Sequence, residues 1–124
     1  MNEIRTCLVV DDSRVMRKVA LRIVEQLNFE GVEACDGLEA LTYCRAAMPD
    51  AILLDWAMPV MDGLEFLRQL RKEPGGHKPV VVFCTAETHP AKIRTALDFG
   101  ANEYIMKPFD GDIIASKFEE VGLI

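Results

Sequence analysis

Residues 51–63 read AILLDWAMPVMDG, and this stretch decides the fold. Its first four residues are apolar, which is typical of a short strand buried on both faces of a parallel sheet. The run stops on Asp55, and an ionised carboxylate is costly to bury unless hydrogen bonds, a cation or a metal compensate it. Asp55 therefore either caps the turn that follows it or has a chemical role.

On both sides of this stretch, short β-branched runs alternate with segments of helical periodicity. The runs predict strands at 6–10, 31–35, 51–54, 80–84 and 103–106. The segments predict helices between the first two strands and at 37–47, 63–72, 89–99 and 111–121, with Thr88 as N-cap and Gly100 as stop of the fourth. This alternation predicts an α/β fold, a parallel sheet with helices on both faces.

The segment between the first two strands predicts one amphipathic helix. Its apolar stripe comprises Val15, Met16, Val19, Ala20, Ile23, Val24 and Leu27. Its other side is basic and comprises Arg14, Arg17, Lys18 and Arg22. We expect the stripe to pack on the sheet and the basic side chains to be solvated.

The composition fits one small domain with protein or small-ligand partners. A chain of 124 residues can bury one hydrophobic core but is short for two domains. Acidic residues outnumber basic ones 20 to 14, and the net charge of −6 argues against nucleic acid or an anionic membrane as partner. The N-terminal apolar run, residues 7–10, is too short for a signal peptide or membrane span, so we expect a cytoplasmic protein without membrane insertion.

The cysteines are widely spaced and form no CxxC or Cys/His cluster; they are Cys7, Cys35, Cys44 and Cys84. This spacing argues against a zinc site and a redox motif. We expect reduced thiols, mostly in the core.

Polar side chains gather at the expected carboxyl ends of the strands, where open α/β sheets bind their ligands. They are Asp11, Asp12, Asp55, Thr85 and Lys107. Three carboxylates about 4 Å apart repel by roughly 4 kcal/mol per pair at an effective dielectric constant of about 20, so they would hold protons or a cation. Mg²⁺ fits best, because it prefers carboxylate, water and phosphate oxygens to Cys or His.

The same residues permit phosphoryl chemistry. The Asp55 carboxylate could form an aspartyl-phosphate, a reaction that depends mainly on positioning and charge neutralisation. Lys107 could offset charge on the phosphoryl group, and Thr85 could donate a hydrogen bond to it. Taken singly, Asp12 could be an N-cap and Thr85 could bond to its own loop. The complete set at consistent strand ends favours the functional interpretation.

These residues lie in motifs that resemble the receiver domains of bacterial two-component response regulators, in particular the stand-alone chemotaxis type. The motifs are VVDDS at 9–13, LLDWAMPVMDGLE at 53–65, CTAE at 84–87 and YIMKPF at 104–109. The resemblance covers essentially the whole chain. It implies one receiver domain over residues 1–124 without an output domain, with a flavodoxin-like, doubly wound five-stranded parallel sheet in the order 2-1-3-4-5 and five helices.

The resemblance also implies roles for the site residues. Asp55 would be the phosphoacceptor, carried as 4-aspartylphosphate, and Mg²⁺ would be bound by Asp11, Asp12, Asp55 and the backbone carbonyl of Ala57. At Ala57 the relatives often carry a polar side chain that contacts the phosphoryl group or its attacking water, whereas Glu87 retains an acid seen in them.

Three further positions follow from the resemblance. Lys107 and Thr85 would contact the phosphoryl group, and Thr85 and Tyr104 would form the conformational switch. The resemblance also favours a cis peptide bond between Lys107 and Pro108, against the general preference for trans.

The function implied is that of a signalling protein rather than an enzyme, one that catalyses only its own phosphorylation and dephosphorylation. A histidine kinase or histidine phosphotransfer protein would donate the phosphoryl group beside the first helix. A downstream target would bind the surface of the fourth helix, fifth strand and fifth helix of a monomer.

Chemotaxis or motility control and a role as phosphorelay intermediate or phosphate sink both remain open. A phosphorylation-independent interaction module is a weaker alternative, because the site residues are intact. A metabolite phosphatase is also weaker, since such enzymes usually carry a second acid where this chain has Ala57.

Overall fold

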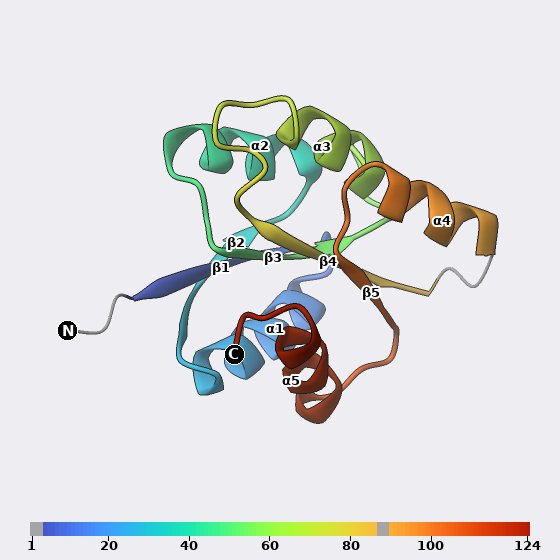
Figure 1. The fold of residues 1–124 in the computed structure, drawn as a ribbon. Helices are drawn as coiled ribbons and strands as arrows, with labels where there is room; N and C mark the ends of the chain where they lie inside the picture. Colours follow the sequence, from blue (N-terminus) through green and yellow to red (C-terminus); the bar gives the residue numbers. More distant parts are fainter. Residues whose placement is uncertain (1–3, 87–89) are drawn as a thin grey trace.

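The computed structural model describes residues 4–86 and 90–124 (Figure 1). The strands are β1 (Arg5–Val10), β2 (Phe29–Ala34), β3 (Ala51–Asp55), β4 (Val80–Thr85) and β5 (Glu103–Met106). The helices are α1 (Arg14–Gln26), α2 (Gly37–Ala46), α3 (Gly63–Leu70), α4 (Pro90–Asp98) and α5 (Gly111–Glu120). The predicted alternation of strands and helices is confirmed.

The strands form one parallel sheet in the order β2-β1-β3-β4-β5, the order that the resemblance implies. Helices α1 and α5 cover one face, and α2, α3 and α4 cover the other (Figure 1). Leu54 of β3 is in register with Val10 of β1 and Phe83 of β4. The central strands therefore end at the same level, and the residues that follow them meet at one edge of the sheet.

Strand β3 lies in the middle of the core, and all of its residues are buried. Its side chains alternate between the two faces of the sheet. Ile52 and Leu54 join the cluster that contains Phe66 of α3, whereas Leu53 joins the cluster that contains Phe118 of α5. Burial on both faces explains why the apolar run before Asp55 is uninterrupted.

The element ends differ by one or two residues from those predicted. Asp55 and Thr85 are the last residues of β3 and β4, whereas the sequence places them just beyond the strands. Helix α3 stops at Leu70, before the predicted Lys72, because the N–H of Glu73 donates to the Leu70 carbonyl and turns the chain into the following loop. Gly100, with a φ of +112°, ends the turn after α4 as expected. Thr88 and Glu87 lie outside the described residues.

Side-chain caps fix the starts of four helices within the described residues. In each, a side-chain oxygen accepts a hydrogen bond from the backbone N–H three residues later, and the caps are Ser13, Asp36, Asp62 and Asp110. Such a cap typically contributes about 1 kcal/mol to stability. Ser13 and Asp62 also fix the direction in which the chain leaves the functional edge of the sheet.

The predicted apolar stripe of α1 is too wide. Ala20 and Val24 are buried against the sheet, but Val15 is 72% and Val19 44% exposed. These two valines lie about 100° around the helix from the line of Met16 and Ala20, beyond the contact with the sheet. They therefore share the outer face of α1 with basic side chains.

The cysteines are all free thiols, as predicted. Cys7, Cys44 and Cys84 are buried, and Cys35, directly after β2, is exposed. Burial raises the pKa of the Cys44 thiol to about 12, and burial is also the main reason that the pKa of Cys84 rises to about 12. None of the helices in residues 4–86 and 90–124 has the length and apolar content needed to cross a bilayer.

Candidate functional site

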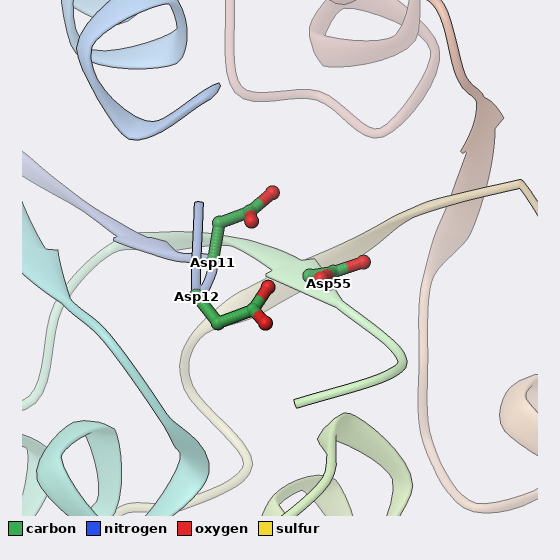
Figure 2. Close-up of side chains that lie close together, drawn as sticks. All are labelled: Asp11, Asp12 and Asp55. Atoms are coloured by element: carbon green, nitrogen blue, oxygen red, sulfur yellow. The ribbon is translucent and has the colours of Figure 1, made fainter. Parts of the chain in front are cut away.

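The structure brings together the three acids predicted to bind a metal (Figure 2). Asp11 and Asp12 follow the end of β1, and Asp55 is the last residue of the neighbouring β3. One carboxylate oxygen from each lies within 4.8 Å of the others. Asp11 and Asp55 are buried, whereas Asp12 is exposed, so one side of the cluster opens to solvent.

Lys107 reaches the same place from the end of β5. Its Nζ donates to Asp11 Oδ2 at 2.9 Å and to Asp55 Oδ1 at 3.1 Å. Its backbone N–H donates to the Thr85 carbonyl at 2.9 Å, which ties the loop to β4. The peptide bond between Lys107 and Pro108 is cis, as the resemblance implies.

The ionised form of Asp55 is disfavoured by burial and by a neighbouring like charge, and it is favoured by Lys107. Burial and the charge of Asp11 raise the pKa of the Asp55 carboxyl group, and the Lys107 ammonium only partly offsets this rise. Burial alone would lower the pKa of Lys107, but its bonds to both carboxylates outweigh burial, so the net pKa is raised. Lys107 therefore stays charged, yet it neutralises only one of three carboxylates.

The chemistry of the donor set fits a hard divalent cation. The cluster offers carboxylate oxygens only, and its exposed side leaves room for the water ligands that Mg²⁺ retains. A divalent cation would also offset the charge of Asp11, which after burial is the second cause of the raised pKa of Asp55. The residues present thus fit Mg²⁺ as the sequence predicts.

The two predicted switch residues lie on neighbouring strands. Thr85 ends β4, is buried, and pairs in register with Met106 of β5. Tyr104 of β5 is half-buried, pairs with Phe83, and packs against the cluster on the α2–α3 side of the sheet. Thr85 is thus one strand away from Asp55, and Tyr104 is two strands away.

Residues of the loop after β3 hold the Asp55 side chain and main chain in place. The Trp56 N–H donates to Asp55 Oδ1 at 2.9 Å, and the Trp56 ring packs 5.1 Å from the Phe83 ring as a wedge beside the site. Ala57 is exposed and brings no polar side-chain atom to the site. Gly63 approaches so closely that an added Cβ would lie 2.2 Å from the Asp55 carbonyl oxygen. Only glycine fits at position 63 without moving the end of β3.

Sequence reasoning missed Arg17, which it assigned to the solvated face of α1. The Arg17 side chain is only 14% exposed, and its Nη1 donates to the Asp11 main-chain carbonyl at 2.6 Å. Residue type does not distinguish Arg17 from the other basic residues of this helix. The one available signal is position, since Arg17 lies about one helical turn after Ser13 and so faces back toward the end of β1.

Comparison with known proteins agrees with this geometry. The family model of the response regulator receiver domain matches residues 7–119. Chemotaxis protein CheY1 of Helicobacter pylori is 36% identical over 116 residues, which covers 92% of this chain and 94% of that protein.

Two solved structures show the same fold. CheY4 of Vibrio cholerae matches with a TM-score of 0.90 at 30% identity, over 96% of this chain and 99% of that one. A complex of CheX with CheY, BeF₃ and Mg²⁺ from Borrelia burgdorferi matches with a TM-score of 0.87 at 26% identity, over 95% and 89% of the chains. With a shared sheet order, an acidic cluster at the strand ends and a family match over most of its length, the chain belongs to the response regulator receiver domain family.

Proposed function

We propose that this chain is a single-domain response regulator that accepts a phosphoryl group on Asp55 from a phosphohistidine of a kinase or phosphotransfer protein. Asp55 itself carries the proposal, because it is a buried carboxylate at a rigid strand end, bonded to Lys107 and flanked by two further acids. The related Borrelia protein with BeF₃ and Mg²⁺ supports it. We also propose that the protein acts as a monomer in the cytoplasm.

In the proposed transfer, a carboxylate oxygen of Asp55 attacks phosphorus, the bond between phosphorus and the donor nitrogen breaks, and its electron pair returns to the histidine. Lys107 is already in place to offset charge on the phosphoryl oxygens, and Thr85 would donate to one of them. Bound Mg²⁺, held by Asp11, Asp12, Asp55 and the Ala57 carbonyl, would supply further charge neutralisation.

The chain would lose the group by hydrolysis, in which water attacks phosphorus, the bond to the Asp55 oxygen breaks and inorganic phosphate leaves. The exposed Ala57 has no polar side-chain atom to orient that water. The proposal limits catalysis to the phosphorylation and dephosphorylation of the protein itself, as in a signalling protein.

The outer face of α1 is proposed to bind the phosphoryl donor. Arg14, Val15, Lys18, Val19 and Arg22 line a shallow groove of about 280 Å³ on this face. The helix begins next to the acidic turn, so a donor seated there would bring its histidine toward Asp55. Exposed valines between basic side chains suit a partner that is apolar at its centre and acidic at its rim.

The output is proposed to be phosphorylation-dependent binding of a target on the α4–β5–α5 surface. Each of these elements carries an exposed apolar side chain: Leu97 (38% exposed), Met106 (36%) and Ile113 (40%). This surface favours a target-binding role, such as chemotaxis or motility control, over a phosphate sink, which would need no target surface.

The proposed phosphoacceptor is tested by labelling with a small donor. Phosphoramidate and Mg²⁺ should phosphorylate the wild type, and Asp55→Asn should abolish labelling, because an amide is a poor nucleophile. Asp98→Asn, which changes an exposed acid of α4, is the matched control and should label normally. Labelling of Asp55→Asn at wild-type stoichiometry would refute the proposal.

A further inference from the structure

Arg17 connects helix α1 to the turn that carries two of the three acids. Its Nη1 donates to the main-chain carbonyl of Asp11 at 2.6 Å, and its Nε donates to Glu33 Oε1 of β2 at 3.1 Å. The other oxygen of Glu33 accepts from Lys18 Nζ at 2.9 Å. The guanidinium is thus held between a strand, a turn and its own helix.

The carbonyl that Arg17 binds belongs to the peptide unit between Asp11 and Asp12. The other groups of Asp11 are also fixed, since its N–H donates to Ala34 and its carboxylate accepts from Ser13 and Lys107. The Asp12 carboxylate differs, because no hydrogen bond to it occurs within residues 4–86 and 90–124. Its place in the cluster therefore depends on the backbone that carries it.

The charge of Arg17 works against a cation site. A guanidinium bonded to the main chain of one proposed metal ligand adds positive charge near the site, which disfavours a metal ion there. Glu33 offsets that charge. The pKa of Glu33 is lowered, mainly by its hydrogen bond to Lys18 and to a smaller extent by its hydrogen bond to Arg17, although burial opposes both. Arg17 thus lies beside a proposed cation site although its charge disfavours a cation there, and Glu33 pairs with that charge. This arrangement indicates that Arg17 contributes to the geometry of the site rather than to its electrostatics.

We propose that Arg17, oriented by Glu33, is a positioning residue for the divalent-cation site, holding the Asp11–Asp12 peptide so that Asp12 points into the cluster. The inference rests on the proposed function only in taking Asp11, Asp12 and Asp55 as the Mg²⁺ ligands. Residues that orient the ligands of a metal typically affect its affinity by about 10-fold or more.

The test turns on the sign of the change in Mg²⁺ affinity. If Arg17 acted through charge alone, Arg17→Gln would tighten Mg²⁺ binding, because a competing cation is lost. Positioning predicts the opposite, a weakening of about tenfold. The affinity is measured by Mg²⁺ titration, followed by calorimetry and by the fluorescence of Trp56, the single tryptophan.

Three further variants separate geometry from charge. Arg68→Gln removes the same charge from the exposed side of α3, away from the site, and should leave the Mg²⁺ affinity unchanged. Arg17→Lys keeps the charge but loses the two-pronged donor, so it should also weaken binding. Glu33→Gln should weaken binding less than Arg17→Gln, and it serves as the test if Arg17→Gln does not fold.

A metal-free readout accompanies the titrations. Hydrogen exchange of the Ser13 amide, which donates to Asp11 Oδ1 at 2.8 Å, should be faster in Arg17→Gln than in Arg68→Gln. Absence of Mg²⁺ binding by the wild type would overturn the proposed function. Wild-type binding together with equal or tighter binding by Arg17→Gln would overturn the role of Arg17 alone.

Discussion

Asp55 is a buried carboxyl group next to a second buried carboxyl group, Asp11, and one lysine serves both. In the folded protein without metal, burial and the charge of Asp11 raise the pKa of Asp55 above that of the unfolded chain. The folded state therefore binds a proton at Asp55 more readily than the unfolded state does. The free energy of unfolding contributed by this group is largest below the unfolded pKa and falls as pH rises through the folded pKa.

This shift predicts the pH dependence of Mg²⁺ binding. A proton on Asp55 competes with the metal, so the apparent affinity should fall as pH is lowered from about 8, beginning above the range near pH 4 in which ordinary aspartates titrate. Titrations of Trp56 fluorescence across this range measure it. Asp55→Asn should bind Mg²⁺ more weakly and with a flatter pH profile. An identical profile in the two proteins would assign the competing proton to another group.

The β3–α3 loop contains both the close approach of Gly63 to the Asp55 carbonyl and a strained turn at Val60. The Met61 N–H donates to the Pro59 carbonyl at 2.7 Å across Val60, which has a φ of +68°. This is a three-residue turn centred on a β-branched residue in the left-handed region, where L-residues other than glycine are disfavoured. Val60 is 77% exposed, so burial of its side chain does not compensate the strain.

Replacing Val60 should therefore stabilise the protein. Val60→Asn is expected to raise the free energy of unfolding by about 1 kcal/mol, because asparagine tolerates positive φ. Equilibrium urea unfolding measures the change. The control is Val15→Asn, an equally exposed valine in helix α1, which should give no gain. A gain of the same size at Val15 would show that lost surface apolarity, rather than backbone strain, is responsible.

The site and the proposed output surface meet at strand β5, which pairs with β4 along the sheet. Thr85 ends β4 beside the Lys107 loop, and Tyr104 lies two residues before Met106 on β5. Moving a two-state protein from about 1:99 to 99:1 needs about 5.5 kcal/mol, more than the roughly 1.5–3 kcal/mol of one hydrogen bond to a charged group. The free energy for the shift must therefore come jointly from the contacts of Thr85, Lys107 and the metal.

Thr85 and Tyr104 should therefore be coupled. With Mg²⁺ and BeF₃ as a phosphoryl analogue, Thr85→Ala and Tyr104→Ala should each reduce the change in the amide NMR signals of Met106 and Ile113. The double variant should lose less than the sum. Thr95→Ala, which removes a hydroxyl bonded within α4, is the control. Additive losses would mean that the two residues act independently.

The sequence pattern predicts a parallel sheet and the gathering of polar residues at its edge for a simple physical reason, whereas the strand order is predicted only from the resemblance to receiver domains. Buried strands of a parallel sheet are short apolar runs, and their carboxyl ends share one edge, so Asp11, Asp55 and Lys107 are brought together by topology alone. Helix faces are harder to predict, because the width of the buried stripe depends on what covers it. Val15 therefore lies outside the core, and Arg17 lies inside the site.

The cysteine pattern provides a ready place for a probe. Because three thiols are buried, a thiol-reactive dye added to the folded protein should attach at Cys35 without removal of the other cysteines. The pKa of Cys35 is raised, first by its hydrogen bond to Glu39, so conjugation will need a mildly alkaline buffer. Cys35 follows Ala34, whose carbonyl accepts from the Asp11 N–H, so the dye would sit beside the acidic turn. A reporter of metal and phosphoryl loading could thus be built from the natural sequence.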